Sequence, residues 1–139
     1  IATAQALDEE MRRRIAAHRA RRGAGWITVE APLELAHALG ALDPGGPALV
    51  DCLTLWLSNA MLAKRDLARE CDALIDALEA CAVPVVAVSN EVGMGIVPDT
   101  ALGRAFRDAQ GILNQRVAAL ADRVVLIAAG LPLVLKGDK

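Results

Sequence analysis

The feature that most constrains this fold is a continuous apolar run at residues 83–88, which ends in a polar, glycine-rich segment at residues 90–98. That segment reads Asn-Glu-Val-Gly-Met-Gly-Ile-Val-Pro, and a helix is expected after it. A run that is apolar throughout favours a strand buried on both faces, as in parallel sheets. In open α/β sheets, ligands bind at the carboxyl ends of such strands. The sequence therefore predicts a buried strand whose exit loop lies at a ligand-binding edge.

Apolar segments alternate with helical ones along the chain. The segments expected as strands are residues 26–30, 47–51, 83–88, 124–128 and 133–135, with residues 1–3 as the end of a further strand. The segments expected as helices are residues 32–42, 54–63, 67–81 and 99–120, with a further helix from residue 8 to the glycines at 23 and 25. This order predicts an α/β fold with a mostly parallel sheet and helices on both faces. The last two strands are too close for a helical crossover, so they are expected to pair antiparallel.

Length and composition narrow the class of protein. A chain of 139 residues with no linker or repeat is expected to form one domain over residues 1–139. Aromatic residues make up 2% of the chain and the net charge is -2, which argues against nucleic acid as a partner. No apolar run is long enough for membrane insertion. Cys52, Cys71 and Cys81 form no C-x-x-C pair, which predicts buried thiols and a cytoplasmic location.

His18 is the first candidate for chemistry. It shares a predicted helix face with Leu7, Met11 and Ile15. Arginines occupy positions 12, 13, 14, 19, 21 and 22 around it. An imidazole nitrogen can attack a phosphate or act as a base, and guanidinium groups match phosphate oxygens. The alternative is a half-buried histidine that completes an apolar stripe, with the arginines solvating the outer face.

Two carboxylates follow predicted strands. Asp51 ends the apolar segment 47–51, and a carboxylate at a strand end can hold Mg²⁺ directly or through water. The alternative is a turn or cap residue ahead of Thr54. Glu30 ends the segment 26–30, and its oxygens could accept hydrogen bonds from the N1–H and the amine of guanine. The alternative is a surface glutamate before a helix led by proline.

The glycine-rich segment and the helix after it carry further polar candidates. Asn90 and Glu91 stand at the mouth of the strand, and Gly93 and Gly95 permit close approach of a phosphate or of a metal-bound water. The alternative is a tight strand-to-helix connection. On the helix, the two pairs with a spacing of seven are Arg107 with Asn114 and Asp108 with Gln115. Such a stripe could face a ligand, another subunit or solvent.

The chain resembles the bifunctional adenosylcobinamide kinase/adenosylcobinamide-phosphate guanylyltransferases of cobalamin biosynthesis. The segments that carry the resemblance are residues 1–5, 8–11, 14–19, 26–30, 49–54, 89–98, 106–108 and 111–115. The most specific of them is the segment from Asn90 to Pro98. The resemblance extends through essentially the whole chain.

The resemblance implies roles for individual residues. His18 matches the histidine that the family guanylylates, forming a covalent GMP-enzyme intermediate. The positions that match nucleotide-contacting residues are Thr3, Ala4, Gln5, Arg19, Ala20, Arg21 and Arg22, with Glu30 and Asp51 as nucleotide-site acids. The resemblance further implies a P-loop NTPase-like fold, adenosylcobinamide and GTP as substrates, ATP as another donor for the kinase step, Mg²⁺ as cofactor, and a homotrimer.

One departure from the family pattern is the lack of a G-x-x-x-x-G-K-[ST] phosphate loop. Family members carry that loop, with a strand before it, ahead of the segment matching Ile1. We expect that the complete protein has residues before Ile1, or that the chain is truncated and inactive. Two alternatives stay open: another P-loop kinase of a small metabolite without a covalent intermediate, or a truncated, non-catalytic nucleotide-binding module.

Overall fold

Parallel pairing aligns four segments within the first 90 residues. In the computed structural model, which describes residues 1–21 and 23–138, β1 (Ala48–Asp51) pairs in parallel with β2 (Val85–Val88). Ala2 forms parallel bridges to both Asp51 and Glu30. The order across the sheet is therefore Glu30, Ala2, β1 and β2, and all four segments run in one direction. Their carboxyl ends meet at one edge, as the apolar runs predict.

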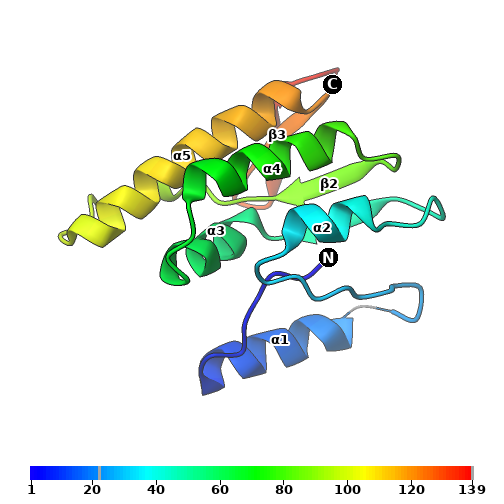
Figure 1. Cartoon of the computed structure of the whole chain (residues 1–139), viewed down its shortest axis with the longest axis horizontal. Helices are drawn as coiled ribbons and strands as arrows, with labels where there is room; N and C mark the ends of the chain where they lie inside the picture. The colour runs from blue at the N-terminus through cyan, green and yellow to red at the C-terminus, as the bar shows by residue number, and fades with distance from the viewer. Residues whose placement is uncertain (22, 139) are drawn as a thin grey trace. The chain divides into compact units, whose positions relative to one another are not determined.

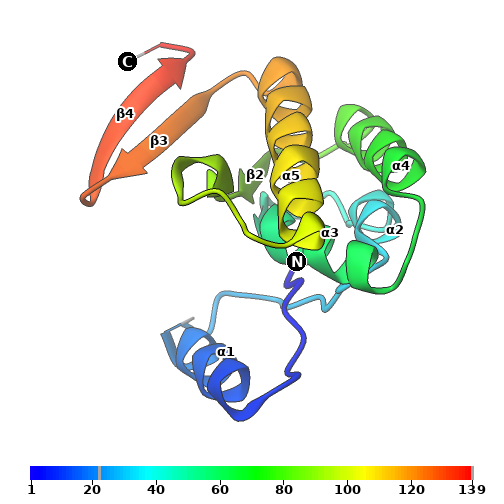
Figure 2. The ribbon, with the colours of Figure 1, turned by 90° about the vertical axis from the view of Figure 1, so that its left-hand side faces the viewer.

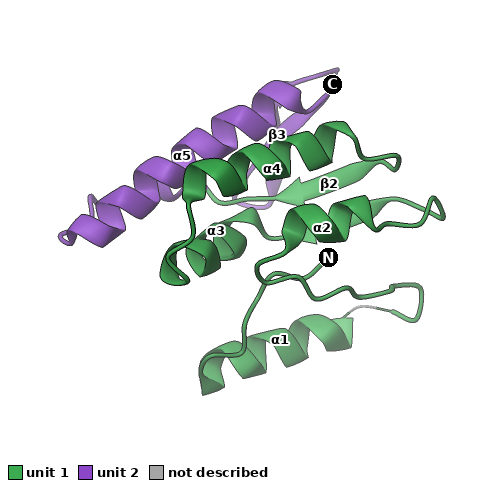
Figure 3. Ribbon diagram, viewed as in Figure 1, with its two compact units in different colours: residues 1–90 green, residues 91–139 purple. Residues whose placement is uncertain are grey.

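The chain divides into two units, residues 1–90 and residues 91–139 (Figure 3). The first unit contains β1, β2 and four helices, which are α1 (Glu9–Arg21), α2 (Leu35–Gly40), α3 (Leu53–Leu62) and α4 (Leu67–Glu79). Helices α2 and α4 lie side by side (Figures 1 and 2). Its core consists mainly of leucine, with Trp56 and Val50. Helix α1 differs from the other three because none of its residues is buried.

The second unit contains a long helix and a β-hairpin. Its elements are the short 3-10 helix η1 (Val92–Met94), α5 (Ala101–Leu120), β3 (Val124–Ala128) and β4 (Leu131–Lys136). Strands β3 and β4 pair antiparallel and form the twisted ribbon in Figure 2. Between them, Ala129 and Gly130 have φ values of 52° and 76°. Two successive positive φ values are those of a type I′ turn, whose twist matches that of the strands it joins.

The α/β class, the parallel sheet and the antiparallel last pair are confirmed, and the architecture is consistent with a P-loop-like fold. Two expectations were wrong, one about a strand and one about the start of a helix. Residues 26–30 do not form a strand: only Glu30 makes a bridge, and Trp26 and Ile27 are 55% and 92% exposed. The helix expected from residue 32 begins at Leu35. The carbonyls of Pro32 and Leu33 instead accept side-chain hydrogen bonds from Asn59 and Trp56.

Other expectations have mixed outcomes. In the part of the chain that the structure describes, the three cysteines are free thiols; Cys52 and Cys71 are buried and Cys81 is partly exposed. Among those residues, no helix combines the length and apolarity that crossing a bilayer requires. The single domain over residues 1–139 stays a prediction.

A buried polar cluster around Thr3 holds the sheet edge together. The Thr3 hydroxyl accepts a hydrogen bond from Cys52 N at 2.8 Å and donates one to Cys52 O at 2.7 Å. Asn59 Nδ2 donates to Thr3 O at 2.8 Å and to Pro32 O at 3.0 Å. Thr3 is fully buried, and Cys52 and Asn59 are nearly so. The cluster therefore ties the segments that follow Ala2, Glu30 and Asp51 to one another and to α3.

Replacing Thr3 tests this cluster. Thr3→Val keeps the shape but leaves the buried N–H and C=O of Cys52 without this partner, so the free energy of unfolding should fall by about 2–4 kcal/mol. Thr3→Ser keeps the hydroxyl and should cost about 1 kcal/mol for the lost methyl group. Urea denaturation followed by circular dichroism measures both. Equal losses for the two variants would contradict a role for the hydroxyl.

The hairpin turn gives a second stability test. Ala129→Asn should raise the free energy of unfolding by about 0.5–1 kcal/mol, because asparagine tolerates a positive φ better than alanine. Gly130→Ala should lower it by about 1–2 kcal/mol for the opposite reason. Thermal or urea denaturation of the two variants should give shifts of opposite sign. Shifts of the same sign would show that backbone conformation does not govern this turn.

Candidate active site

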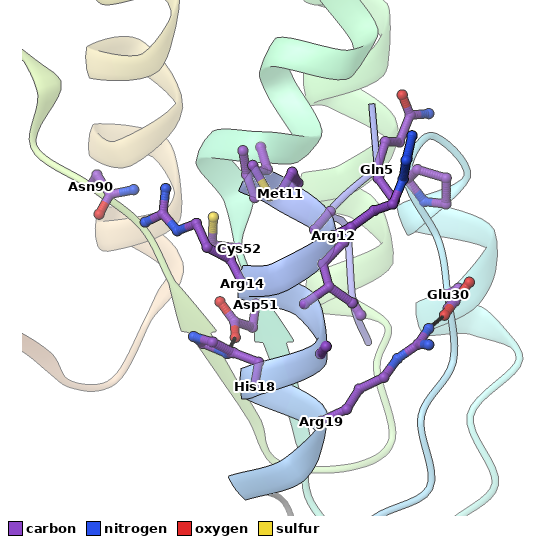
Figure 4. Close-up of a pocket in the computed structure, with 17 residues that line it drawn as sticks. Gln5, Met11, Arg12, Arg14, His18, Arg19, Glu30, Asp51, Cys52 and Asn90 are labelled. Atoms are coloured by element: carbon purple, nitrogen blue, oxygen red, sulfur yellow. Dashed lines mark hydrogen bonds and ion pairs between the residues drawn. The ribbon is translucent and has the colours of Figure 1, made fainter. Parts of the chain in front are cut away.

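A cavity of about 920 Å³ lies at the carboxyl edge of the parallel segments in the first unit (Figure 4). The lining comes from α1, from the carboxyl ends of the parallel segments with the chain just after them, and from the start of α3. Its residues are Ala2, Ala4, Gln5, Ala6, Met11, Arg12, Arg14, Ile15, Ala16, His18, Arg19, Glu30, Pro32, Asp51, Cys52, Leu55 and Asn90. This is the edge where ligands bind in open α/β sheets. Of the predicted site residues, it brings together Ala4, Gln5, His18, Arg19, Glu30, Asp51 and Asn90.

The two acids owe their places to backbone pairing. Thr3 N donates to Asp51 O at 3.1 Å, and Ala31 N donates to Ala2 O at 2.9 Å. Ala2 thus lies between Glu30 and Asp51, and both carboxylates line the cavity. The cavity therefore has one acid on each side of the Ala2 segment.

His18, the predicted catalytic residue, lies beside the carboxylate of Asp51. His18 Nδ1 lies 3.5 Å from Asp51 Oδ2, with side chains 51% and 30% exposed (Figure 4). A carboxylate beside one ring nitrogen favours the tautomer with the proton on that nitrogen. The other nitrogen, Nε2, then keeps its lone pair and can act as a nucleophile or a base. Because α1 buries no residue, His18 is not part of an apolar core stripe.

Arg19 and Glu30 form an ion pair and a hydrogen bond on the other side of the cavity (Figure 4). They also line a second cavity of about 310 Å³, together with Gly23, Trp26 and Thr28. Both side chains are more than half exposed. The two cavities thus share the Arg19–Glu30 pair, and the second one adds an indole ring and a hydroxyl group.

The residues after β2 divide between the two units. Asn90 belongs to the first unit, where its N and Nδ2 donate to Thr54 Oγ1 at 2.9 and 3.1 Å. Thr54 therefore binds Asn90, and this contact ties the exit of β2 to α3. Glu91, Gly93 and Gly95 belong to the second unit, where Asn114 Nδ2 donates to Glu91 Oε1 at 2.8 Å.

The predicted polar stripe on α5 is partly satisfied within the second unit. Arg107 pairs with its neighbour Asp108 at 2.9 Å. Asn114 accepts from Gln110 Nε2 at 2.8 Å while it donates to Glu91. The stripe therefore helps to hold the start of the glycine-rich loop, and its role toward a ligand or another subunit stays a prediction.

Some residues implied by the resemblance do not line the cavity. The Thr3 side chain is buried and hydrogen-bonded to Cys52. Ala20 and Arg21 are exposed at the end of α1 and are not among the lining residues. Arg22 lies outside the described residues. The nucleotide contacts assigned to these four positions stay predictions.

The cavity also contains Cys52 and Leu55, which sequence reasoning did not name as site residues, and Arg12 and Arg14, which it named only as members of the arginine run. Helical spacing could have found Arg14, because it stands four residues before His18 and three after Met11. Cys52 directly follows Asp51, so the strand end could have indicated it. No comparable signal marks Leu55.

Asp51, the predicted magnesium ligand, lines the cavity. Among the described residues, no group of three or more histidine, cysteine or acidic side chains forms a metal cluster. Mg²⁺ bound with a nucleotide commonly uses one or two carboxylates, with phosphate oxygens and waters as its other ligands. The two acids of the cavity wall, Glu30 and Asp51, lie on opposite sides of the Ala2 segment, so a metal at Asp51 would take most of its ligands from phosphate and water.

Comparison with known proteins identifies the family of this chain. Residues 1–135 match the family model described as cobinamide kinase / cobinamide phosphate guanyltransferase. The chain is 48% identical over 141 residues to the bifunctional adenosylcobalamin biosynthesis protein CobP of Pseudomonas aeruginosa, covering 99% of this chain and 82% of that protein. It is 40% identical over 152 residues to CobU of Salmonella typhimurium, covering 98% and 84%. CobU of Escherichia coli is 37% identical over 152 residues, with the same coverage of 98% and 84%.

The resemblance read from the sequence is thereby confirmed over nearly the whole chain. The chain belongs to the cobinamide kinase / cobinamide phosphate guanyltransferase family.

Proposed function

We propose that this protein carries out both reactions named for its family: it phosphorylates adenosylcobinamide and then transfers GMP from GTP to adenosylcobinamide phosphate, giving adenosylcobinamide-GDP. The transfer runs through a covalent guanylyl-histidine at His18. The observation that carries the proposal is the 3.5 Å approach of His18 Nδ1 to Asp51 Oδ2 within the cavity at the sheet edge. Family membership supports the pair of reactions.

The first half of the guanylyl transfer uses His18 as nucleophile. His18 Nε2 attacks the α-phosphorus of GTP, a nitrogen–phosphorus bond forms, and the bond to the β-phosphate oxygen breaks. Pyrophosphate leaves with the electron pair of that bond. The imidazole gains positive charge, which the neighbouring Asp51 carboxylate stabilises through the Nδ1–H.

In the second half, a phosphate oxygen of adenosylcobinamide phosphate attacks the same phosphorus. The nitrogen–phosphorus bond breaks, and neutral His18 is restored. The product carries a new phosphoanhydride bond between its own phosphate and GMP. Splitting the transfer in this way lets one site bind two bulky substrates in succession.

Glu30 and the second cavity suit the guanine base. A carboxylate accepts from both the N1–H and the amine of guanine, which adenine does not offer in that arrangement. Trp26 supplies an aromatic face in the same cavity. Because Arg19 and Glu30 line both cavities, a nucleotide can extend from His18 to Glu30. Ala4 and Gln5 line the larger cavity and are proposed to contact the nucleotide there. Four further contacts rest on the family resemblance alone: Thr3, Ala20, Arg21 and Arg22.

The kinase step shares the cavity in this proposal. GTP, or ATP, donates its γ-phosphoryl group to the hydroxyl of the aminopropanol arm of adenosylcobinamide. Asp51 would hold Mg²⁺, which neutralises phosphate charge when bound.

The loop with Asn90, Glu91, Gly93 and Gly95 is assigned to phosphate or corrinoid binding. A homotrimer in the cytoplasm completes the proposal, and sedimentation equilibrium measures the subunit number.

His18 is tested by covalent labelling. The intact protein incubated with GTP labelled at the α-phosphate should acquire one acid-labile, alkali-stable label per active site, as expected of a phosphoramidate. His18→Ala should abolish the label, because no nucleophile remains. His37→Ala is the matched control: His37 is the other histidine of the chain, is exposed on α2, and lies outside the cavity lining.

The labelling result also separates the alternatives. A protein that phosphorylates adenosylcobinamide but never takes up the α-label would be a kinase without a covalent intermediate. One that neither labels nor phosphorylates would be a non-catalytic nucleotide-binding module. Full labelling of His18→Ala would remove His18 from its proposed role.

Glu30 is tested by base preference. In Glu30→Gln, one acceptor oxygen becomes an amide donor, so kcat/KM for label transfer from GTP should fall by roughly 10- to 100-fold, which corresponds to about 1–3 kcal/mol of lost recognition. Preference for GTP over ATP should narrow by a similar factor. Glu79→Gln, at the exposed end of α4, should match the wild type. An unchanged preference in Glu30→Gln would place the base elsewhere.

A further inference from the structure

Arg14 stands out among the arginines of α1 by its position and its contacts. It lies one helical turn before His18, and both line the larger cavity. In Figure 4 its side chain lies on the same side of α1 as His18, beside Asp51 and Cys52. The adjacent Arg13 is exposed and is not among the lining residues. Consecutive positions on one helix therefore present one arginine to the cavity and one away from it.

Among the residues that the structure describes, the Arg14 guanidinium has only a weak partner. Its Nη1 lies 3.8 Å from Glu10 Oε1, beyond hydrogen-bonding distance, and the two side chains are 69% and 75% exposed. Exposed pairs of this kind contribute little. Arg12 and Arg19, which line the same cavity, hydrogen-bond to Glu9 and Glu30. Arg14 can therefore turn to an anion at little cost.

We infer that Arg14 is a catalytic residue of the guanylyl transfer, with its guanidinium binding the non-bridging oxygens of the α-phosphate as His18 attacks. The inference rests on the proposed function and adds a residue to it. In the transition state, the nucleophile and the leaving group are both partly bonded to phosphorus. The negative charge on the non-bridging oxygens must then be stabilised. A planar guanidinium can bind two such oxygens at once, whereas an ammonium group acts as a point charge.

The proposed step balances within the groups already named. The His18 Nε2–phosphorus bond forms, the bond from phosphorus to the β-phosphate oxygen breaks, and pyrophosphate carries away the electron pair. Arg14 gives up no proton in this step and exchanges only hydrogen bonds. Its effect is therefore on the rate of attack and of the reverse reaction, and the amount of guanylylated enzyme at equilibrium changes little.

The test compares Arg14→Ala, Arg14→Lys and Arg13→Ala in single-turnover labelling of the intact protein with α-labelled GTP and Mg²⁺. At saturating GTP, Arg14→Ala should lower the labelling rate constant by about 100-fold, as for loss of one donor to a developing oxyanion. Arg14→Lys should recover part of that loss. Arg13→Ala, the matched control, should stay within about twofold of wild type.

Two further readouts distinguish catalysis from structure. Pyrophosphate added to preformed guanylyl-enzyme should release the label from Arg14→Ala about 100-fold more slowly, because the same transition state is crossed in reverse. The final extent of labelling and the thermal midpoint should match those of Arg13→Ala.

Labelling of Arg14→Ala at the rate of Arg13→Ala, or an equal slowing of both variants, would overturn the role of Arg14 and leave the guanylyl-histidine intact. A wild-type protein that never becomes labelled would instead overturn the proposed function itself. The two failures are therefore distinguishable in one experiment.

Discussion

The site depends on the buried hydrogen bonds that hold Ala2 and Thr3 between two other parallel segments. The Thr3 hydroxyl satisfies both backbone groups of Cys52, and Asn59 satisfies the carbonyls of Thr3 and Pro32. Because these groups are buried, a shift of any one segment would leave several of them without partners. The positions of Glu30 and Asp51 follow directly, since each is bridged to Ala2. The acids are thus placed by backbone geometry, and their side chains line the cavity, where Asp51 lies beside His18 and Glu30 pairs with Arg19.

The cationic side of the site is built differently. Helix α1 has no buried residue; Asp8 caps its start by accepting from Met11 N at 2.7 Å. Its arginines and His18 reach the cavity from an exposed helix, and they meet acids that the sheet holds in place. The two acids at the sheet edge therefore face an exposed helix that carries His18 and several arginines. Such a helix suits the proposed substrate, because the substrate carries phosphate charge and a large organic group.

Much of this could be predicted because the relevant signals are local. Continuous apolar runs predicted β1 and β2, and two polar residues near their carboxyl ends, Asp51 in β1 and Asn90 after β2, line the cavity. The prediction failed at residues 26–30, since an apolar, β-branched segment pairs only where a neighbour offers backbone groups. The arginine run around His18 was predicted as a phosphate site, but helical spacing was not used to choose among its members, so Arg14 was not singled out although it lines the cavity with His18. The Thr3 cluster joins residues about fifty positions apart, and no local pattern indicates such a contact.

The ion pair shared by the two cavities has an electrostatic consequence. Arg19 already binds Glu30 Oε1, so a base that hydrogen-bonds to that oxygen, as proposed for guanine, would compete with the guanidinium. Guanine is neutral, so its arrival at Glu30 would free a full positive charge one residue away from His18. Under the proposed function, purine selectivity and the electrostatic field at the reacting phosphorus would both depend on this competition. Both respond to ionic strength, because an exposed pair of this kind weakens as salt is added.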